Sequence, residues 1–434
     1  MFRLISKIPL KNNSIGKKVP YHSKFLIVGA GDGGVSTATY LRKNVKNTPQ
    51  DITLIDPNTE YIYQSGLTMV GGGIKPLENI KIKLSKRLPQ GVNHVQQQVT
   101  SVKPDQNLVI CEDGTELSYE YLVLSVGINP RLDLIKGLKE ALEDENIPVA
   151  TNYLPASAKK MYGLIKNFRG GKALFSMPST PIKCAGAPLK VMFLSANEWK
   201  NKNLNSEINF HAGTPKIFSN PYYLPALENI ARDYGINLNT ESELIEINSK
   251  TRTAKFKQLN DNSIKEENFD LMHVTPIMKT PNFLNESQLV SSNGFVDVNI
   301  NTLQHNKYKN IFALGDCANL PISKTLSAVN DQFHIVVRNI EDMLKGKEPS
   351  NKYFGYTGCP IFVGDKKVML CEFGYNNRIM PTFLKDQRKP RKMFYHLKVN
   401  IFDKLALYNL CGIIRPIRQT LSKFPYDKHR DYKA

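Results

Sequence analysis

The feature that most constrains the fold of this 434-residue chain is a glycine-rich turn between two apolar segments near its start. Residues 24–28 (KFLIV) predict a buried strand, and the turn that follows reads Gly29-Ala30-Gly31-Asp32-Gly33-Gly34. A helical pattern then continues to Lys43, and residues 51–56 (DITLID) predict a second strand that ends in an acidic residue. Strand, glycine turn, helix and strand in this order are the fingerprint of a dinucleotide-binding βαβ unit.

Four residues of this fingerprint have distinct mechanical roles. Gly29 makes the tight turn, Gly31 lets the backbone approach a pyrophosphate, and Gly34 lets the helix pack closely on the strand. The free N–H groups at the start of the helix attract the phosphates. Asp56 can accept a hydrogen bond from a ribose hydroxyl, and its charge disfavours a ribose 2′-phosphate.

Three later segments also read as strands that end in a turn. Residues 119–127 predict a strand that ends at Gly127, and residues 310–314 predict a buried strand followed by Gly315-Asp316 and a helix over 324–344. Residues 172–178 begin a further unit of the same type. We therefore predict an α/β fold with two Rossmann-like dinucleotide-binding domains in tandem, followed by a C-terminal helical membrane-associating segment.

The turn after the 172–178 strand lacks the glycines that a nicotinamide cofactor requires. It reads Ser179-Thr180-Pro181-Ile182-Lys183-Cys184, in which the proline has no N–H and the isoleucine is bulky. A pyrophosphate would therefore find few backbone donors there. We predict that this turn serves cysteine chemistry in place of cofactor binding.

Two of the six cysteines lie in matched segments rich in proline and glycine. Cys184 lies within residues 181–188 (PIKCAGAP), and Cys359 lies within residues 356–360 (YTGCP). Such turns differ from the periodic apolar faces on which packing cysteines lie, so we predict that this pair is catalytic. We expect only packing roles for the remaining cysteines, which are Cys111, Cys317, Cys371 and Cys411.

On these patterns, residues 24–375 resemble the glutathione reductase-like flavoproteins, which have two dinucleotide-binding domains. The resemblance implies FAD as cofactor, bound by residues 24–150 and by a returning part, residues 275–375. Residues 151–274 would then form the second Rossmann-like domain, which carries Cys184. Besides the fingerprint residues, the cofactor contacts that the resemblance implies are Gly127, Asp316 at the ribityl chain and Lys324 near the flavin.

Four segments carry a closer resemblance, to sulfide:quinone oxidoreductases of the mitochondrial type. They are residues 177–188 (MPSTPIKCAGAP), 272–276 (MHVTP), 315–325 (GDCANLPISKT) and 356–360. This resemblance implies an FAD-dependent enzyme that oxidises sulfide, reduces ubiquinone and passes sulfur to an acceptor such as glutathione.

The same resemblance implies roles for the cysteines and for two lysines. Hydrosulfide would attack a disulfide, or a polysulfide bridge, between Cys184 and Cys359, which leaves a persulfide on one cysteine and a thiolate on the other. We assign the persulfide to Cys359 and the thiolate that faces the flavin to Cys184, although the sequence permits the reverse. Lys190 and Lys398 are candidates for the sulfide entrance, where they would stabilise thiolates.

The charge distribution suits a basic leader and a basic tail. The net charge is +19, and the first 31 residues contain no acidic residue. Residues 1–23 therefore read as a mitochondrial transit peptide, or else as a disordered basic leader with no targeting role.

Residues 376–434 alternate apolar and basic positions, as in helices that lie in a membrane interface, although a helical cap over the domains is an alternative. With the resemblance, this predicts an enzyme bound peripherally to the mitochondrial inner membrane.

Three other functions compete with this interpretation. A type II NADH:quinone oxidoreductase requires the glycine-rich turn that residues 179–184 replace. A flavocytochrome-type sulfide dehydrogenase would be periplasmic, and the N-terminus does not read as a secretory signal. A flavoprotein that binds nucleic acid would explain the basic charge, but no known nucleic-acid motif is present, so we expect no nucleic-acid partner. We also expect no metal, because Cys-x-x-Cys is absent and His273 has no companion ligand at a suitable spacing.

Overall fold

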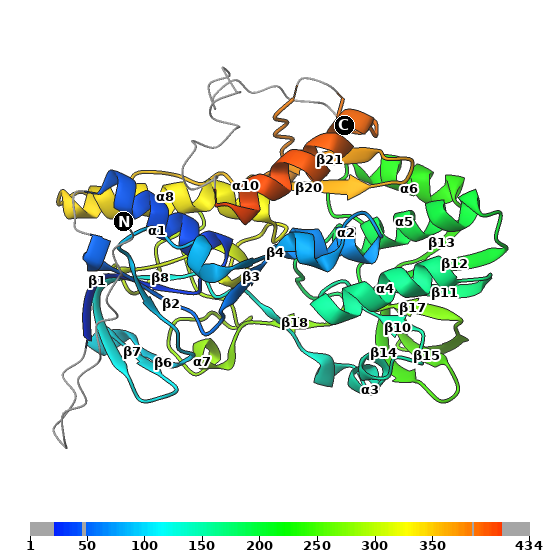
Figure 1. The fold of residues 1–434 in the computed structure, drawn as a ribbon, viewed down its shortest axis with the longest axis horizontal. Helices are drawn as coiled ribbons and strands as arrows, with labels where there is room; N and C mark the ends of the chain where they lie inside the picture. The colour runs from blue at the N-terminus through cyan, green and yellow to red at the C-terminus, as the bar shows by residue number, and fades with distance from the viewer. Residues whose placement is uncertain (1–20, 46–48, 384–385, 410–434) are drawn as a thin grey trace, which may run out of the picture.

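The computed structural model describes residues 21–45, 49–383 and 386–409. Figure 1 shows two α/β lobes side by side, each with its own sheet, and a C-terminal segment that lies across both. The predicted leader, residues 1–23, falls almost entirely outside the described residues. The first strand, β1 (Tyr21–Val28), already begins at Tyr21, because Tyr21 and His22 pair with Leu117 and Ser118.

The first lobe is built on a seven-stranded sheet in the order β5-β2-β1-β8-β7-β6, with β19 paired to β8. The strands beside β1 are parallel and buried on both faces, which is why they read as continuous apolar runs. The helices α1 (Asp32–Asn44) and α8 (Leu326–Leu344) pack against each other on one face. The other strands of this sheet are β2 (Ile52–Ile55), β5 (Asn93–Val95), β6 (Val99–Lys103), β7 (Leu108–Cys111), β8 (Glu116–Leu124) and β19 (Ile311–Ala313).

The second lobe is built on a five-stranded parallel sheet in the order β10-β17-β11-β12-β13. Its core includes Trp199, which is buried against Phe168 and Phe175. The strands are β10 (Val149–Ala150), β11 (Gly171–Met177), β12 (Ser206–Ala212), β13 (Ile236–Asn239) and β17 (Leu271–His273). The helices around them are α3 (Leu138–Glu143), α4 (Pro155–Asn167), α5 (Ala187–Asn201) and α6 (Leu224–Asp233).

The chain passes between the lobes twice, at two short strands that pair with each other. β9 (Asn129–Pro130) leaves the first lobe, and β18 (Met278–Lys279) returns to it. The first sheet therefore contains strands that precede the second lobe in the sequence and one strand, β19, that follows it. The predicted fold class, with two Rossmann-like units in tandem, is confirmed.

Smaller elements complete the two lobes. An antiparallel sheet of β14, β15 and β16 lies beside the second lobe, and the hairpin of β3 and β4 lies beside the first. These elements are β3 (Glu60–Ile62), β4 (Lys81–Lys83), β14 (Ser242–Asn248), β15 (Thr253–Gln258), β16 (Ile264–Asn268), α2 (Leu67–Gly71) and α7 (Asn282–Asn285).

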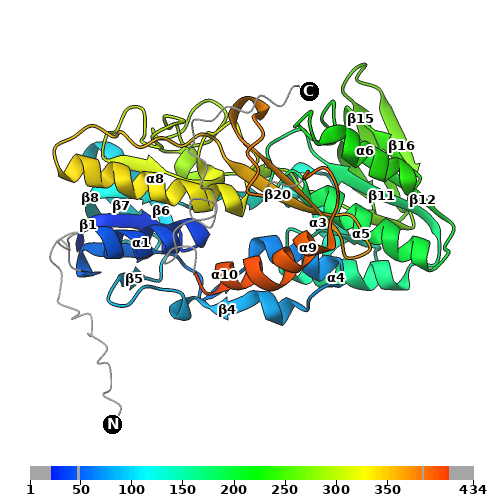
Figure 2. The ribbon, with the colours of Figure 1, turned by 90° about the horizontal axis from the view of Figure 1, so that it is seen from above.

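The C-terminal part consists of a hairpin and a short helical segment. The hairpin strands are β20 (Thr357–Phe362) and β21 (Val368–Phe373). The helical segment runs through α9 (Lys392–His396), a π-helical stretch (Leu397–Phe402) and α10 (Asp403–Leu407). Figure 2 shows α9 and α10 in line along one side of the molecule. None of the described helices combines the length and the apolar character needed to cross a membrane.

The glycines of the first turn behave as their spacing predicts. Gly29 has a φ of +100°, and a Cβ there would lie 2.5 Å from the carbonyl oxygen of Ser125. A Cβ on Gly34 would collide with the carbonyl oxygen of Gly29. A Cβ on Gly31 would meet no protein atom within 4 Å, so this glycine leaves space open in front of the turn. Two of the three glycines thus serve packing, and the third leaves room in front of the turn, as its predicted role requires.

We expect Gly34→Ala to lower the free energy of unfolding by about 2 kcal/mol, because the added methyl group overpacks a contact with rigid backbone. Gly163→Ala is the matched control, since Gly163 lies inside α4 and its Cβ would meet nothing within 4 Å. That change should stabilise the protein by about 0.5 kcal/mol. Urea unfolding followed by circular dichroism measures both values. Equal midpoints for the two variants would contradict the packing role of Gly34.

Candidate active site

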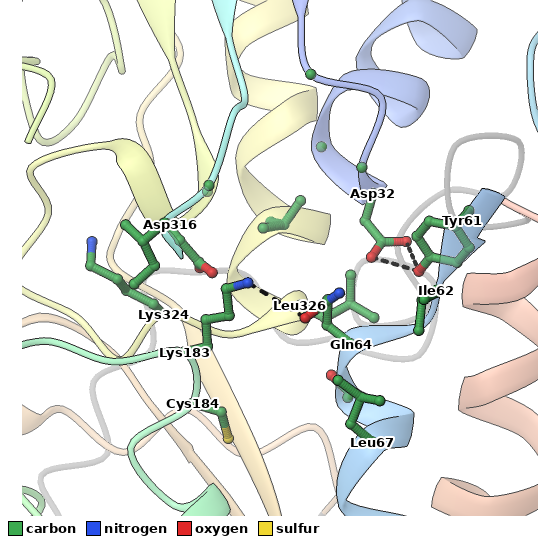
Figure 3. A pocket seen from close by; sticks show the side chains of 18 of the residues that line it. Asp32, Tyr61, Ile62, Gln64, Leu67, Lys183, Cys184, Asp316, Lys324 and Leu326 are labelled. Atoms are coloured by element: carbon green, nitrogen blue, oxygen red, sulfur yellow. Dashed lines mark hydrogen bonds between the residues drawn. The ribbon is translucent and has the colours of Figure 1, made fainter. Parts of the chain in front are cut away.

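A cavity of about 360 Å³ runs between the lobes from the first glycine turn to the cysteine pair. Gly31 and Asp56 line one end, and Cys184 and Lys190 line the other. Figure 3 shows the middle of this cavity, where side chains from both lobes face each other. The cavity thus extends from the predicted pyrophosphate site to the predicted redox centre.

The end of the cavity near the glycine turn is preorganised for a ribose and its phosphates. The carboxylate of Asp56 accepts the N–H of Ala30 at 2.7 Å and the N–H of Asn58 at 2.8 Å. These two bonds fix the carboxylate at the end of β2, beside the opening that Gly31 leaves. Gly127, also predicted, lines the cavity with a φ of +68° and open space at its Cβ position.

The helix that follows the turn is held by an ion pair that the sequence analysis missed. Arg87 is buried and donates to the carboxylate of Asp32 at 2.9 Å, and its guanidinium lies 3.4 Å from the ring centre of Tyr61. The hydroxyl of Tyr61 also donates to Asp32 at 2.7 Å (Figure 3). This network fixes the first residue of α1. Only the position of Asp32 in the glycine turn signalled it in the sequence.

Asp316 lies in the middle of the cavity between two lysines. Burial raises the pKa of its carboxyl group, and the charges of Lys324 and Lys183 oppose that shift. The amine of Lys324 donates to the carbonyl of Ala318 at 3.1 Å and lies 4.1 Å from the ring centre of Phe295. Figure 3 shows this amine pointing away from the centre of the cavity. Lys324 therefore contributes charge at a distance.

Lys183 is the lysine that extends into the cavity, although the sequence analysis emphasised Lys324. Its amine lies 3.5 Å from the side-chain oxygen of Gln64 in the opposite lobe (Figure 3). Burial lowers the pKa of the Lys183 amine, and the charge of Asp316 opposes the shift. The helix that the sequence predicts from residue 324 begins at Leu326 in the structure. Thr325 caps it by accepting the N–H of Ala328 at 3.2 Å.

The amide side chain of Asn152 indicates that a polar ligand completes this cavity. Asn152 is 3% exposed and lines the cavity, yet neither its oxygen nor its nitrogen has a hydrogen-bond partner in the described part of the chain. A buried amide without partners is costly in an empty site. Together with the opening at Gly31 and the carboxylate of Asp56, it fits the FAD that the sequence implies.

The two cysteines that the sequence singles out are in contact, although they come from different segments. The sulfur atoms of Cys184 and Cys359 lie 3.0 Å apart. Cys184 follows β11, and Cys359 lies in the middle of β20. Gly186 makes the contact possible, because a Cβ there would lie 2.5 Å from the Cys359 sulfur. A disulfide bond of about 2.0 Å needs only a small further approach of the two sulfur atoms.

The backbone holds Cys184 in an unusual conformation for a residue with a side chain. Its φ is +51°, in the left-handed region. The N–H of Cys184 donates to the carbonyl of Lys324 at 2.7 Å, and its own carbonyl accepts the N–H of Ala187 at 2.7 Å. Such conformations persist where the surroundings fix them, as they often do at reactive residues. These two bonds fix the direction of the thiol.

The two thiols have different acidities because their surroundings differ. The pKa of Cys184 is well below its usual value, chiefly because Cys359 donates a hydrogen bond to its thiolate. The amine of Lys190, 3.1 Å from the Cys184 sulfur, lowers that pKa further against the effect of burial. The pKa of Cys359 is well above its usual value, since its proton is held by Cys184 and the site is buried. Cys184 is therefore the thiolate of the pair.

The two predicted lysines are close enough to the sulfur pair for their charges to act on it. Lys190 is buried, and although burial lowers its pKa, the charges of Cys184 and Cys359 raise it overall, so it stays protonated. Lys398 is also buried, and burial together with the charge of Lys190 lowers its pKa to about 7. Its amine donates to the hydroxyl of Tyr63 at 2.7 Å. Lys398 can therefore take up or release a proton near neutral pH.

Three of the four other cysteines are buried, as expected for packing residues. Cys111 and Cys317 lie in the first lobe, and burial raises the pKa of each thiol to about 11. Cys371 is buried opposite Cys359 in the hairpin. Cys411 lies outside the described residues.

His273 has a structural role. Burial lowers the pKa of its ring to about 3, and the ring accepts the N–H of Asn152 at 3.2 Å.

We expect Lys190→Met to slow alkylation of Cys184 severalfold at neutral pH, because loss of the adjacent positive charge raises the thiol pKa. Lys200→Met, on an exposed part of the same helix, is the matched control and should leave the rate unchanged. The measurement is the pH dependence of iodoacetamide labelling of the reduced protein. A profile for Lys190→Met that overlies that of the control would contradict the role of this charge.

Comparisons with known proteins show which family the chain belongs to. Residues 23–160 match the pyridine nucleotide-disulphide oxidoreductase family. The mitochondrial sulfide:quinone oxidoreductase of Schizosaccharomyces pombe is 36% identical over 404 residues, which cover 88% of this chain and 88% of that protein. The mitochondrial enzyme of Mus musculus is 36% identical over 388 residues, which cover 88% of this chain and 85% of the relative.

A solved structure supports the fold independently. The structure of the sulfide:quinone oxidoreductase from Aquifex aeolicus aligns with a TM-score of 0.75 at 18% identity, and it covers 93% of this chain and 95% of the other. At that identity the likeness concerns the fold alone. The identity to the mitochondrial relatives, over nearly their whole length, defines the family. The chain belongs to the mitochondrial sulfide:quinone oxidoreductases, which are FAD-dependent flavoprotein enzymes.

Proposed function

We propose that this enzyme oxidises sulfide at the Cys184–Cys359 pair, delivers the two electrons through FAD to ubiquinone, and releases the sulfur to an acceptor such as glutathione. The observation that carries the proposal is the 3.0 Å contact between the two sulfur atoms at the end of the cavity. A reversible disulfide there gives a soft nucleophile such as hydrosulfide a sulfur atom to attack.

The different acidities of the thiols support Cys359 as the persulfide carrier. Thiol–disulfide exchange runs fastest when the departing thiol has the lower pKa. Cys184 is that thiol, because the amine of Lys190, 3.1 Å away, stabilises its thiolate. Attack of hydrosulfide on the Cys359 sulfur therefore forms a persulfide on Cys359 and frees the thiolate of Cys184.

The buried lysines supply the charge that this step requires. Lys190 stays protonated beside Cys184 and stabilises the negative charge that develops there. Lys398, held by Tyr63, can take the proton that hydrosulfide loses, because its pKa of about 7 is close to neutral. Both predicted lysines thus have a role inside the site.

FAD supplies the two-electron redox chemistry between sulfide and quinone when it is bound. In our proposal, the predicted residues Gly29, Gly31, Gly34 and Asp56 hold its pyrophosphate and ribose. Gly127 and Asp316 contact its middle part, with Lys324 adding positive charge nearby. Cys184, at the far end of the same cavity, would then face the reactive ring.

The second lobe supports electron entry through sulfide over entry through NADH. In a nicotinamide-binding domain the N–H groups after the first strand face the phosphates. Here the N–H of Ser179 donates to the carboxylate of Glu243 at 2.8 Å. That carboxylate also packs where a Cβ of Gly213, at the end of β12, would lie. The Ser179 N–H that could have faced a phosphate is therefore already paired with a carboxyl group.

We expect sulfide to bleach the flavin absorption in an anaerobic titration of the FAD-loaded protein, and NADH to leave it unchanged. Cys184→Ser and Cys359→Ser should each reduce the rate of bleaching by at least about 100-fold, because neither can form the reactive disulfide. Cys111→Ser is the control, since Cys111 lies in β7 of the first lobe. Bleaching by NADH in place of sulfide would overturn the proposal.

We also propose that the C-terminal helical segment rests on the membrane from which ubiquinone is drawn. Met393, Ile401 and Tyr408 of this segment are 43%, 46% and 61% exposed, and the side chains of Lys392 and Lys404 beside them are exposed too. Apolar and basic side chains together are typical of helices at an anionic membrane surface. The predicted location at the mitochondrial inner membrane, which the mitochondrial relatives support, agrees with this proposal.

We expect replacement of Met393, Ile401 and Tyr408 by serine to reduce flotation with vesicles of phosphatidylcholine and cardiolipin by at least about tenfold, because burial of three apolar side chains is lost. Ile264→Ser is the control, since Ile264 is 61% exposed on β16 of the second lobe. Equal flotation of the triple variant and the control would exclude this segment as the membrane contact.

A further inference from the structure

The hairpin that carries Cys359 separates two hydrophobic cores, and this decides which side chains can reach the site. Alternate residues of a strand point to opposite faces. Phe362, Val368 and Leu370 pack in the core of the first lobe. The residues that alternate with them along the two strands pack in the core of the second lobe. They are Cys359, Ile361, Met369, Cys371 and Phe373. Cys371 therefore faces the same side as Cys359.

The register of the hairpin places Cys371 directly opposite Cys359. The two residues are paired Cα partners in the antiparallel β20–β21 ladder, and both side chains are fully buried. Facing residues of such a ladder have Cβ atoms about 5 Å apart. Their sulfur atoms can therefore exchange a group. The charges of Lys190 and Cys184 act on the Cys371 thiol as well, although burial is the main cause of its raised pKa.

We propose that Cys371 is a third sulfur-carrying residue, which accepts the sulfane sulfur of a Cys359 persulfide when no external acceptor has removed it. This inference rests on the proposed function, because it requires the persulfide on Cys359. It revises the packing role that the sequence suggested for Cys371. Among the described cysteines, Cys111 and Cys317 lie in the other core and have no such partner.

The transfer step is balanced without any further reactant. The Cys371 sulfur attacks the outer sulfur of the Cys359 persulfide, a new sulfur–sulfur bond forms on Cys371, and the old one on Cys359 breaks. The proton of the Cys371 thiol passes to the departing Cys359 sulfur. No atom is oxidised or reduced overall, because one persulfide and one thiol give one persulfide and one thiol. Cys359 is then free to close the disulfide with Cys184 again, an oxidation whose two electrons pass to FAD and on to the quinone, as in the proposed function.

The consequence is a store for sulfur inside the protein. Without a store, an enzyme whose acceptor is absent stops once Cys359 carries a persulfide. With Cys371 as a store, the Cys184–Cys359 pair can complete one further reaction with sulfide. The same exchange in reverse returns the sulfur to Cys359 when the acceptor arrives.

The test follows the sulfur by mass. The FAD-loaded protein receives isotopically heavy sulfide and a soluble quinone under anaerobic conditions, without an acceptor, while the flavin absorption is recorded. Thiols and persulfides are then alkylated, and the protein is cleaved with trypsin. Lys366 and Lys367 separate the two residues, so residues 353–366 carry Cys359 and residues 368–378 carry Cys371.

We expect heavy sulfur on both peptides of the unmodified protein. In Cys371→Ala the total heavy sulfur bound per chain should fall to about half, since one of the two storage positions is lost. Cys111→Ala is the control for loss of a buried thiol. In Cys359→Ser the peptide of residues 368–378 should carry no heavy sulfur, because the sulfur reaches Cys371 only through Cys359.

Each remaining outcome overturns the inference. If the flavin bleaches but residues 368–378 stay unlabelled, Cys371 is a packing residue and the proposed function is unaffected. If that peptide is labelled in Cys359→Ser as well, the sulfur arrives from solution and not by transfer. If the flavin does not bleach at all, the proposed function fails, and the store fails with it.

Discussion

The active site depends on one backbone hydrogen bond between the lobes, in which the N–H of Cys184 donates to the carbonyl of Lys324 at 2.7 Å. Cys184 follows the first strand of the second lobe, and Lys324 precedes α8 of the first lobe. The bond draws the turn of residues 179–184 over the end of the cofactor cavity. It also holds Cys184 in its left-handed conformation, with the thiol directed at Cys359. Without this bond the sulfur pair and the cavity would be separate features.

The asymmetry of the sulfur pair arises from the elements that surround it. Lys190 lies on the first turn of α5, so it approaches Cys184 from the same segment of chain. Cys359 lies in a β-strand between two cores, where burial disfavours its charged form. A single local contact thus distinguishes two chemically identical residues. It is the physical basis of the proposed roles of the two cysteines.

Much of the fold, and part of the site, could be predicted from the sequence because the signals are local. Strand, glycine turn, helix and acidic residue lie within 24–56, and their spacing alone fixes the shape of the unit. The proline and glycine residues around Cys184 and Cys359 singled out the pair. Family resemblance, and not spacing, joined these cysteines to Lys190 and Lys398.

What the sequence missed depends on contacts between distant segments. Nothing near Lys183 or Lys324 indicates which amine extends into the cavity, since the direction is set by Gln64 and Phe295 on other elements. Asn152 reads as an ordinary turn residue, and only the structure shows that its amide is buried in the cavity without a protein partner in the described part of the chain. The role proposed for Cys371 likewise depends on the register of a hairpin, which its neighbours in the sequence do not reveal.

The carboxylate of Glu243 has a consequence for how this lobe can change during evolution. It satisfies the N–H of Ser179 and fills the space beside Gly213, so it stabilises the turn in its present form. Removal of the carboxylate alone would leave a backbone donor without its partner. Introduction of glycines alone would leave a negative charge facing a phosphate. A change to nicotinamide binding would therefore require several simultaneous substitutions, and each single step on that route is disfavoured.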